Sequence, residues 1–297
     1  MQESAARVVL PSGVWVDGTH QRVAWLRPLT GRDELAAAAL EGRPYAARID
    51  SLLAGCTTAL GSVPDPPEHV IAALTLGDRE ALLLALRGLT YGTRIDALAH
   101  CPHCKGRLDL ELTTEQLRLR PYAHPQLHHR VELGKYSVVF RLPTGADQLA
   151  TAGLNDNEGE AELLRRCVVE VSRADNQSEA SPGGTEPEVD RAGSAPATLP
   201  PELAHDVSAA MQRQDPQSEL MLQLTCPDCA RDFSTVLDTA DYLLREIADR
   251  AGSLFAQVHT LALLYHWSEA EILNLPHVRR SRYLQLLDQP HTAGVPL

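Results

Sequence analysis

Four of the six cysteines stand in two short pairs with the spacing of metal ligands. Cys101 and Cys104 lie in "HCPHC", and Cys226 and Cys229 lie in "TCPDC". Two thiolates separated by two residues converge on one tetrahedral zinc ion from a tight turn, and two such pairs close a structural site that keeps no open position for catalysis. The pairs therefore predict one structural Zn²⁺ held by all four sulfur atoms.

The separation of the pairs is unusual for a zinc ribbon. An ordinary ribbon places its pairs roughly fifteen to twenty residues apart, whereas 121 residues lie between Cys104 and Cys226. Each doubling of a flexible loop adds only about 0.6 kcal/mol, against about 10 to 16 kcal/mol of apparent affinity for a structural zinc. The affinity for zinc therefore outweighs the entropic cost of the long loop, and one shared site is possible. Two alternatives stay open: independent free dithiols, or redox pairs, although a thioredoxin-like pair opens a helix.

Alternating apolar residues on both sides of each pair predict a strand, a tight turn and a second strand. These residues are Ile95, Ala97, Ala99, Leu108, Leu110 and Leu112 around the first pair, and Leu220, Leu222, Leu224, Phe233 and Leu237 around the second. Each pair is therefore expected at the tip of a β-hairpin. His103, within the first knuckle, is expected to face solvent because four cysteines already fill a tetrahedron.

Three landmarks recur in the same order along the chain, which predicts an internal duplication. The stretch "LRPLTGRDELAAA" at 26–38 resembles "FRLPTGADQLATA" at 140–152. Cys56 then matches Cys167, and the first cysteine pair matches the second. A threonine followed three residues later by aspartate is a common helix start, so the prediction depends on the shared order. We expect two similar half-domains, 1–114 and 115–238, that meet at a pseudo-twofold zinc.

Hydrophobic periodicity places helices between these landmarks. The predicted helices are 31–40, 45–60 and 77–90 in the first half and 145–152, 158–172 and 200–213 in the second. Strands are predicted within 7–29 and in a hairpin over 129–143 that turns at Gly134. The stretch 173–199 is rich in Ser, Glu, Pro, Gly and Ala, so we expect a disordered insertion there.

The C-terminal region, 239–297, is predicted to be wholly helical and to lack a counterpart in the first half. Apolar residues recur at three-to-four spacing from Leu243 to Tyr265. Ser268 and Glu271 form a capping-box signature that starts a second helix, and Pro276 opens a third. The expected partner-binding residues are Trp267, Arg279, Arg280, Arg282, Tyr283 and Leu284, a basic and aromatic end on an acidic protein.

The predicted fold class is α+β, with two similar half-domains of short strands and helices joined through a split four-cysteine site that resembles a zinc ribbon, and an all-helical C-terminal region. With 297 residues and 44% hydrophobic content the chain can bury a sizeable core. No apolar run reaches membrane-spanning length and the N-terminus lacks a secretory signal, so a cytoplasmic protein with no membrane partner is expected. The net charge of -12 disfavours nonspecific nucleic-acid binding.

Enzymatic activity is not expected. The sequence contains no GxSxG, no phosphate-binding Gly-Lys-Ser loop, no dinucleotide fingerprint and no HExxH. We therefore expect no small-molecule substrate, and contacts with other proteins as the mode of action. The alternative from another class is a zinc-ribbon nucleic-acid-binding or regulatory adaptor, whose binding would fall steeply with salt.

Several stretches together carry a family resemblance. The tail "SLFAQVHTLALLYHWSEAEILNLPHVRRSRYLQLL", with "LRPLTGRDE", "LLALRGLTYG" and the paired CPxC knuckles, resembles the baseplate hub assembly chaperone family of contractile-tailed phages and phage-tail-like contractile injection systems. The resemblance covers most of the chain outside 173–199. It implies a non-enzymatic assembly protein whose partners are tail or baseplate hub proteins, found in the cytoplasm or in a phage or tail-like particle.

Overall fold

The computed structural model describes residues 5–16, 18–173 and 199–288, and it shows a mixed α and β fold with several small sheets. The first part of the chain contains β1 (Ala6–Val16), β2 (Thr19–Leu26), α1 (Gly31–Ala39), α2 (Tyr45–Cys56), β3 (Thr57–Leu60), β4 (Val63–Pro64), α3 (Glu68–Ala72), α4 (Leu76–Tyr91), β5 (Arg94–His100), β6 (Arg107–Thr113) and α5 (Thr114–Leu117). The next part contains β7 (His129–Leu133), β8 (Tyr136–Phe140), α6 (Gly145–Ala150), α7 (Asp156–Cys167), β9 (Val168–Arg173), η2 (Pro201–Leu203), α8 (Ala204–Gln214), η3 (Pro216–Ser218), β10 (Leu220–Thr225) and β11 (Asp232–Leu237). The C-terminal helices are α9 (Thr239–Tyr265), α10 (Glu269–Leu273) and α11 (His277–Asp288).

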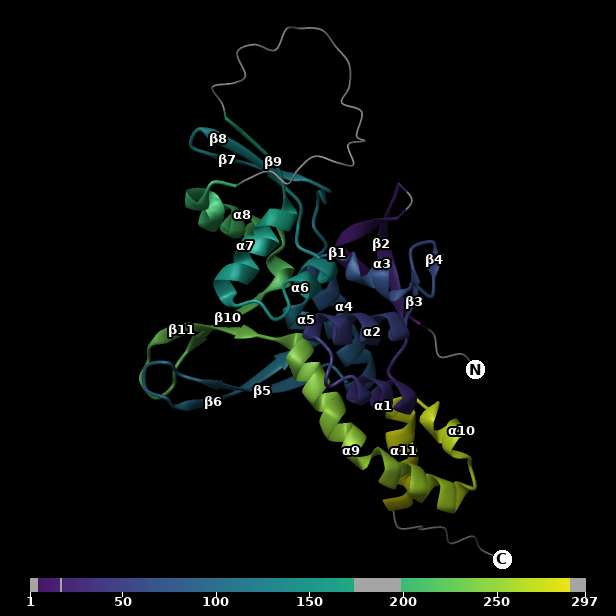
Figure 1. Ribbon diagram of the computed structural model, residues 1–297. Helices are drawn as coiled ribbons and strands as arrows, with labels where there is room; N and C mark the ends of the chain where they lie inside the picture. Colours follow the sequence, from purple (N-terminus) through teal and green to yellow (C-terminus); the bar gives the residue numbers. More distant parts are fainter. Residues whose placement is uncertain (1–4, 17, 174–198, 289–297) are drawn as a thin grey trace, which may run out of the picture.

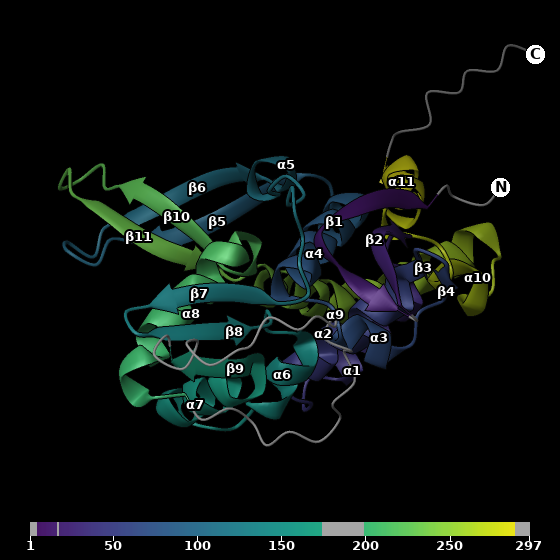
Figure 2. The same cartoon turned by 90° about the horizontal axis from the view of Figure 1, so that it is seen from above.

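The strands form four antiparallel sheets, and among the described residues no sheet combines strands from both halves of the chain. One sheet has the order β1-β2-β3-β4 and another has the order β7-β8-β9, while β5–β6 and β10–β11 are separate hairpins. These two hairpins project side by side from the body, as Figures 1 and 2 both show. The expected insertion, 173–199, falls almost wholly outside the described residues. Within the described ranges, no helix has the length and apolarity that a bilayer crossing requires.

The two halves repeat the same contacts where a hairpin leads into a helix. α1 and α6 both begin with a capping box, in which an aspartate accepts a hydrogen bond from the backbone of the capping threonine. An arginine just before each box then pairs with that aspartate. The distances are 2.8 Å from Thr30 N to Asp33 Oδ2 and 2.6 Å from Arg27 Nη1 to Asp33 Oδ2, against 3.0 Å from Thr144 N and 2.5 Å from Arg141 Nη1 to Asp147 Oδ2.

The two matched cysteines occupy equivalent places as well. Cys56 ends α2 and Cys167 ends α7, and both side chains are fully buried. The carbonyl of Cys56 accepts from the backbone of Arg27 at 3.0 Å, and that of Cys167 accepts from Arg141 at 2.9 Å. The predictions that helices continue to 60 and 172 are wrong, because the next residues, rich in Thr and Val, pair with β2 and β8 as strands β3 and β9.

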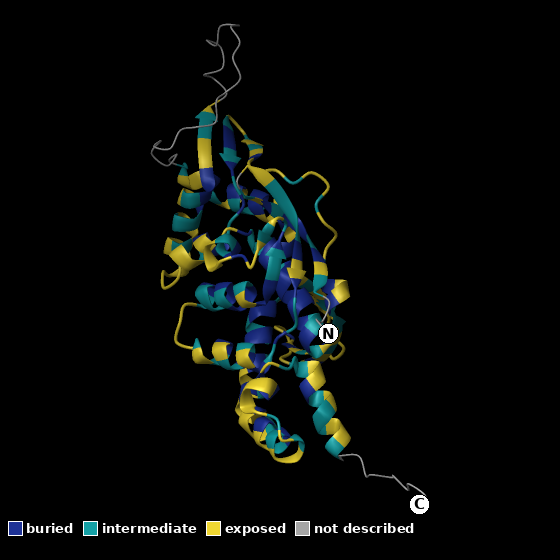
Figure 3. Ribbon diagram, turned by 90° about the vertical axis from the view of Figure 1, so that its right-hand side faces the viewer, coloured by how far each residue is buried: buried dark blue, intermediate teal, exposed yellow. Residues whose placement is uncertain are grey.

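The hydrophobic cores show how the C-terminal helices are attached. One core joins β1, β2, α2 and α4 with the first turns of α9, through Leu243, Leu244 and Ile247. A second core fills the space between the β7-β8-β9 sheet, α7 and α8. A third core lies between the far half of α9, α10 and α11. Buried residues are concentrated in the central body and exposed residues at its ends, as Figure 3 shows. The N-terminal part of α9 therefore belongs to the core of the first half.

Helices α10 and α11 resemble α3 and α4 in their local arrangement. In both pairs a five-residue helix is followed by a turn and an isolated bridge, Thr75 to Thr144 in one and Pro276 to Thr30 in the other. Each bridge brings the second helix to a capping box. Arg79 then packs on Gly145, and Arg280 packs on Gly31. The start of α4 thus packs on the second half, and the start of α11 packs on the first.

Candidate metal centre

The four paired cysteines meet at one point, although they come from distant parts of the chain. Their sulfur atoms all lie within 4.8 Å of one another. Cys101 Sγ is 3.7 Å from Cys229 Sγ, and Cys104 Sγ is 3.5 Å from Cys226 Sγ. A tetrahedral zinc with Zn–S bonds of about 2.3 Å separates its sulfur ligands by about 3.8 Å. The donor set therefore fits a tetrahedral metal ion.

The two knuckles have the same backbone conformation. In the first, the Cys101 N–H donates to the Gly106 carbonyl and the Lys105 N–H donates to the Cys101 carbonyl, both at 2.9 Å. In the second, the Cys226 N–H donates to the Arg231 carbonyl at 3.0 Å, and the Ala230 N–H donates to the Cys226 carbonyl at 2.9 Å. Lys105 and Ala230 both have positive φ, 64° and 56°. Each turn thus directs both of its sulfur atoms toward the other hairpin.

The hairpins hold the knuckles against each other through a small apolar core. Ala99 and Leu108 face each other across β5 and β6, and Leu224 faces Phe233 across β10 and β11. These residues pack with Cys101 and Cys226, which are fully buried. The alternation read from the sequence is confirmed here, since the apolar residues point inward and their neighbours outward.

The tips of the two hairpins approach closely. A Cβ atom added to Gly106 would lie 2.2 Å from Asp228 Oδ2 in the opposite knuckle. A side chain at position 106 would therefore have to displace the Asp228 carboxylate, and it would also crowd Cys104 Sγ at 3.2 Å. Gly106 therefore lies at the contact between the knuckles, and its place after the first cysteine pair is the only local pattern that marks it.

Neighbouring groups shift the pKa values of the first cysteine pair in opposite directions. Burial raises the pKa of Cys101, but the N–H groups of Cys104 and His103 and the neighbouring thiols outweigh this and lower the pKa to about 6. For Cys104 the N–H of Gly106 lowers the pKa, yet the adjacent sulfur atoms raise it to about 12. Of these two thiols, Cys101 therefore ionises more readily than Cys104. A divalent cation supplies the charge that lets all four ionise.

The chemistry of this arrangement is structural. Four protein ligands leave no open position for water or substrate on a tetrahedral ion. The distances of 3.5 and 3.7 Å between sulfur atoms of opposite knuckles are far longer than a disulfide bond of about 2.05 Å. A metal held here would link β5–β6 to β10–β11, and through them the two halves of the chain.

Five of the six residues expected to bind a partner lie on α11, and Trp267 lies between α9 and α10, but the six differ in accessibility. Arg279 and Arg282 are exposed. Trp267, Tyr283 and Leu284 are half-buried in the core of the C-terminal helices, where Trp267 and Tyr283 meet edge to face at 4.8 Å. Arg280 is 1% exposed, and its guanidinium pairs with Glu34 of α1. The expectation that Arg280 contacts a partner is therefore wrong, because its charge is used inside the fold.

A buried polar network around Glu34 went unnoticed in the sequence. Glu34 is 0% exposed and accepts a hydrogen bond from the Tyr91 hydroxyl at 3.2 Å. His277 Nδ1 lies 3.3 Å from its Oε1, and Arg280 binds its Oε2. This network attaches α11 to α1 and α4. From the sequence alone, a glutamate in the first turn of a helix is expected to be a favourable surface charge. Its role in holding α11 becomes visible only from the position of that helix in the structure.

The chain matches one family model. The model is described as "T4 bacteriophage base plate protein", and it matches residues 14–244, which is more than half of the chain. No curated protein and no solved structure matches the chain. The matched region contains both cysteine pairs and ends in the first turns of α9.

Proposed function

We propose that this chain, which belongs to the T4 bacteriophage base plate protein family, is a non-enzymatic structural or assembly protein of a contractile-tail baseplate. The observation that carries the proposal is the family match over residues 14–244. Within that role, the resemblance of the C-terminal helices favours an assembly chaperone of the baseplate hub, in a phage or in a phage-tail-like injection system. Its partners are then other tail or baseplate proteins.

The function is tested by deleting the gene in the phage or injection system that encodes it. We expect tails without functional baseplates in electron micrographs, and restoration by the gene supplied in trans. Normal baseplates in the deletion strain would contradict the proposal. Probing purified particles with an antibody then separates the two roles, because a chaperone is absent from finished particles and a permanent component is present.

We propose that the four cysteines hold one structural Zn²⁺. The proposal is supported by the convergence of all four sulfur atoms within 4.8 Å and by the matching turns of the two knuckles. The ion would stabilise the contact between β5–β6 and β10–β11 rather than act on a substrate. Thiolate ligands favour zinc over hard cations such as magnesium and calcium.

We propose that the two halves, 1–114 and 115–238, descend from one duplicated unit, with 239–297 as an added helical region. Several features support this: the capping boxes, the arginines that pair with them, the helices that end at a buried cysteine, and the knuckles. The similarity of α3–α4 to α10–α11 extends the repetition into the tail. In this account the zinc lies near a pseudo-twofold axis.

We propose that α11 presents Arg279 and Arg282 to an acidic patch on a tail protein, while Trp267, Tyr283 and Leu284 shape the helical support. The support for this is that both arginines are exposed on a protein of net charge -12. Arg279→Glu with Arg282→Glu should weaken association with the purified baseplate partner, and Arg245→Glu, an exposed site on α9, serves as the control. Equal binding by all variants would refute this surface.

The nucleic-acid alternative receives less support. Basic residues on the outer faces of the first hairpin are paired with acids, Arg94 with Asp96 and Glu111, and Arg107 with Asp109. A phosphate backbone would have to displace these carboxylates while meeting a strongly acidic protein.

A further inference from the structure

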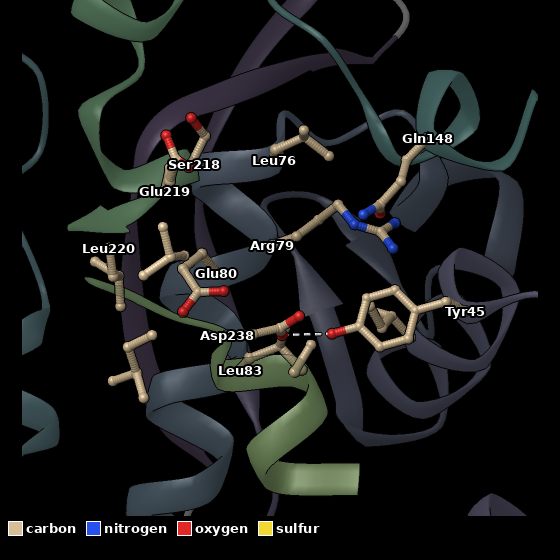
Figure 4. A pocket seen from close by; sticks show the side chains of 14 residues that line it. Tyr45, Leu76, Arg79, Glu80, Leu83, Gln148, Ser218, Glu219, Leu220 and Asp238 are labelled. Carbon is tan, nitrogen blue, oxygen red and sulfur yellow. Dashed lines mark hydrogen bonds between the residues drawn. The ribbon is translucent and has the colours of Figure 1, made fainter. Parts of the chain in front are cut away.

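A cavity of about 150 Å³ lies where the two halves of the chain meet the start of α9 (Figure 4). It is separate from the cysteine cluster and from the exposed arginines of α11. Its walls are largely apolar and come from α2, α4, β10, β11 and α9. The apolar lining residues are Ile49, Leu76, Leu83, Leu220, Val236, Leu237 and Ala240.

Carboxylates dominate the polar part of the lining. Glu80 comes from α4, whereas Glu219 and Asp238 are exposed residues that lie together at the base of the β10–β11 hairpin, next to the paired Leu220 and Leu237. The Tyr45 hydroxyl donates to Asp238 Oδ1 at 2.5 Å and closes one side, as Figure 4 shows. The cation in the lining, Arg79, is already paired with the buried Asp50. The cavity therefore has an excess of negative charge.

Glu80 contributes one unsatisfied oxygen atom to the cavity lining. Its Oε1 atom is buried and has no hydrogen-bond donor among the described residues. Burial raises the pKa of Glu80 to about 8, a hydrogen bond with the Thr239 side chain opposes this rise, and the nearby charge of Asp238 adds to it. Glu80 is therefore largely protonated at neutral pH, and a bound cation would stabilise its ionised form. None of the described residues forms an ion pair with Glu80.

The spacing of the acids bears on which cation fits. Among the described residues, the cysteine cluster is the group of ligand atoms close enough to hold a metal ion. The acids of this cavity do not form such a group. A long aliphatic stem with a charged head suits the site better, because methylene groups bury well against apolar walls while the head reaches a polar group. A lysine ammonium is also more compact than a guanidinium.

We propose that this cavity receives a lysine side chain from a partner polypeptide, with its methylene groups between Leu83 and Leu220 and its ammonium group at Glu80 and Asp238. Beside the cavity, Met221 and Val236 face each other across β10 and β11 and are 45% and 49% exposed. This apolar pair gives the partner's main chain a place to pack. The inference stands on the cavity alone and does not depend on the family assignment.

The experiment uses two short peptides as probes. One is a capped alanine–lysine–alanine tripeptide, and the other has norleucine in place of lysine. Amide chemical shifts of Leu220, Val236 and Ala240 are followed by NMR on the full chain during each titration. We expect saturable shifts with the lysine peptide, and at least about tenfold weaker binding of the norleucine peptide, since a tenfold change corresponds to only about 1.4 kcal/mol.

Substitutions then locate the charge that matters. Glu80→Gln keeps the shape of the side chain and should weaken the lysine peptide about tenfold, whereas Glu170→Gln, an exposed site on β9, should leave binding unchanged. Equal binding of the two peptides, or no chemical-shift change at these amides, overturns the proposal. Both results are measured on the unmodified protein, so they hold even if Glu80→Gln fails to fold. Butylammonium binding as tightly as the lysine peptide would also overturn it, because the peptide would then contribute nothing.

Discussion

The ion pair between Arg280 and Glu34 allows a quantitative test of how the C-terminal helices are held. The two side chains are 1% and 0% exposed. Arg280→Ala removes the guanidinium and leaves the Glu34 carboxylate buried with only Tyr91 and His277 as partners. Removing one member of a buried pair costs about 3 to 5 kcal/mol. We therefore expect a loss of that size in the free energy of unfolding of this region at neutral pH.

The same contact predicts a pH dependence. Burial raises the pKa of Glu34, but the hydrogen bond with His277 and the charge of Arg280 outweigh it and hold the pKa below its usual value. A carboxyl whose pKa is lower in the folded state stabilises the fold above its unfolded pKa, and the stabilisation disappears as pH falls through the folded value. The penalty of Arg280→Ala should therefore be full at pH 7 and shrink below about pH 4.

Trp267 provides a local reporter for this measurement. Its ring contacts Tyr283 of α11, so its fluorescence should change when the C-terminal helices separate. In a background with Trp15→Phe and Trp25→Phe, urea titrations give the stability of this region directly. The control is Arg279→Ala, an exposed neighbour, which should change stability by no more than about 0.5 kcal/mol. A loss below about 1 kcal/mol for Arg280→Ala, or one equal to the control, would refute the reasoning.

Three further predictions use melting curves as the readout. Gly145→Ala should lower the melting temperature more than Gly31→Ala. The new Cβ at position 145 would lie 1.9 Å from Arg79 Nη1, whereas the new Cβ at position 31 would lie 3.0 Å from Arg280 Nη1. Equal effects of the two substitutions would contradict this packing. Asp147→Asn should lower the free energy of unfolding by about 2 to 4 kcal/mol at pH 7, because Arg141 and Arg166 hold the pKa of Asp147 low despite its burial. This loss of stability should shrink as the pH drops below about 4. A loss that does not change with pH would contradict the prediction. Cys101→Ser should lower the melting temperature strongly, while Cys167→Ala, a buried cysteine outside the cluster, should act only as a core truncation; similar effects would argue against a metal.

Local patterns in the sequence predict much of the fold. The hairpins around the cysteine pairs follow from strict alternation, and the capping box at Ser268 and Glu271 marks the start of α10 correctly. The helix starts at Thr30 and Thr144 are also confirmed. These features depend on neighbours within a few residues, and short-range chemistry is visible in one sequence. The convergence of the four sulfur atoms, by contrast, was predicted from ligand chemistry rather than from local pattern.

What could not be predicted depends on distant contacts. Residues 57–60 continue an apolar periodicity after α2, and they become a strand only because the edge of β2 is available to pair with them. Arg280 reads as a solvated charge, and it is buried only because α11 folds back onto α1. Glu80 likewise gives no sign that its carboxylate lies in a cavity without a donor. Such roles arise from packing between segments that are far apart in the chain.

The most direct test of the account is the metal content of the purified chain, measured by native mass spectrometry together with elemental analysis. The unmodified protein should carry one zinc per chain, and Cys226→Ser should lose it although the first cysteine pair is intact. That result would show that a single ion spans both halves. Zinc retained by Cys226→Ser, or no metal in the unmodified protein, would contradict the account.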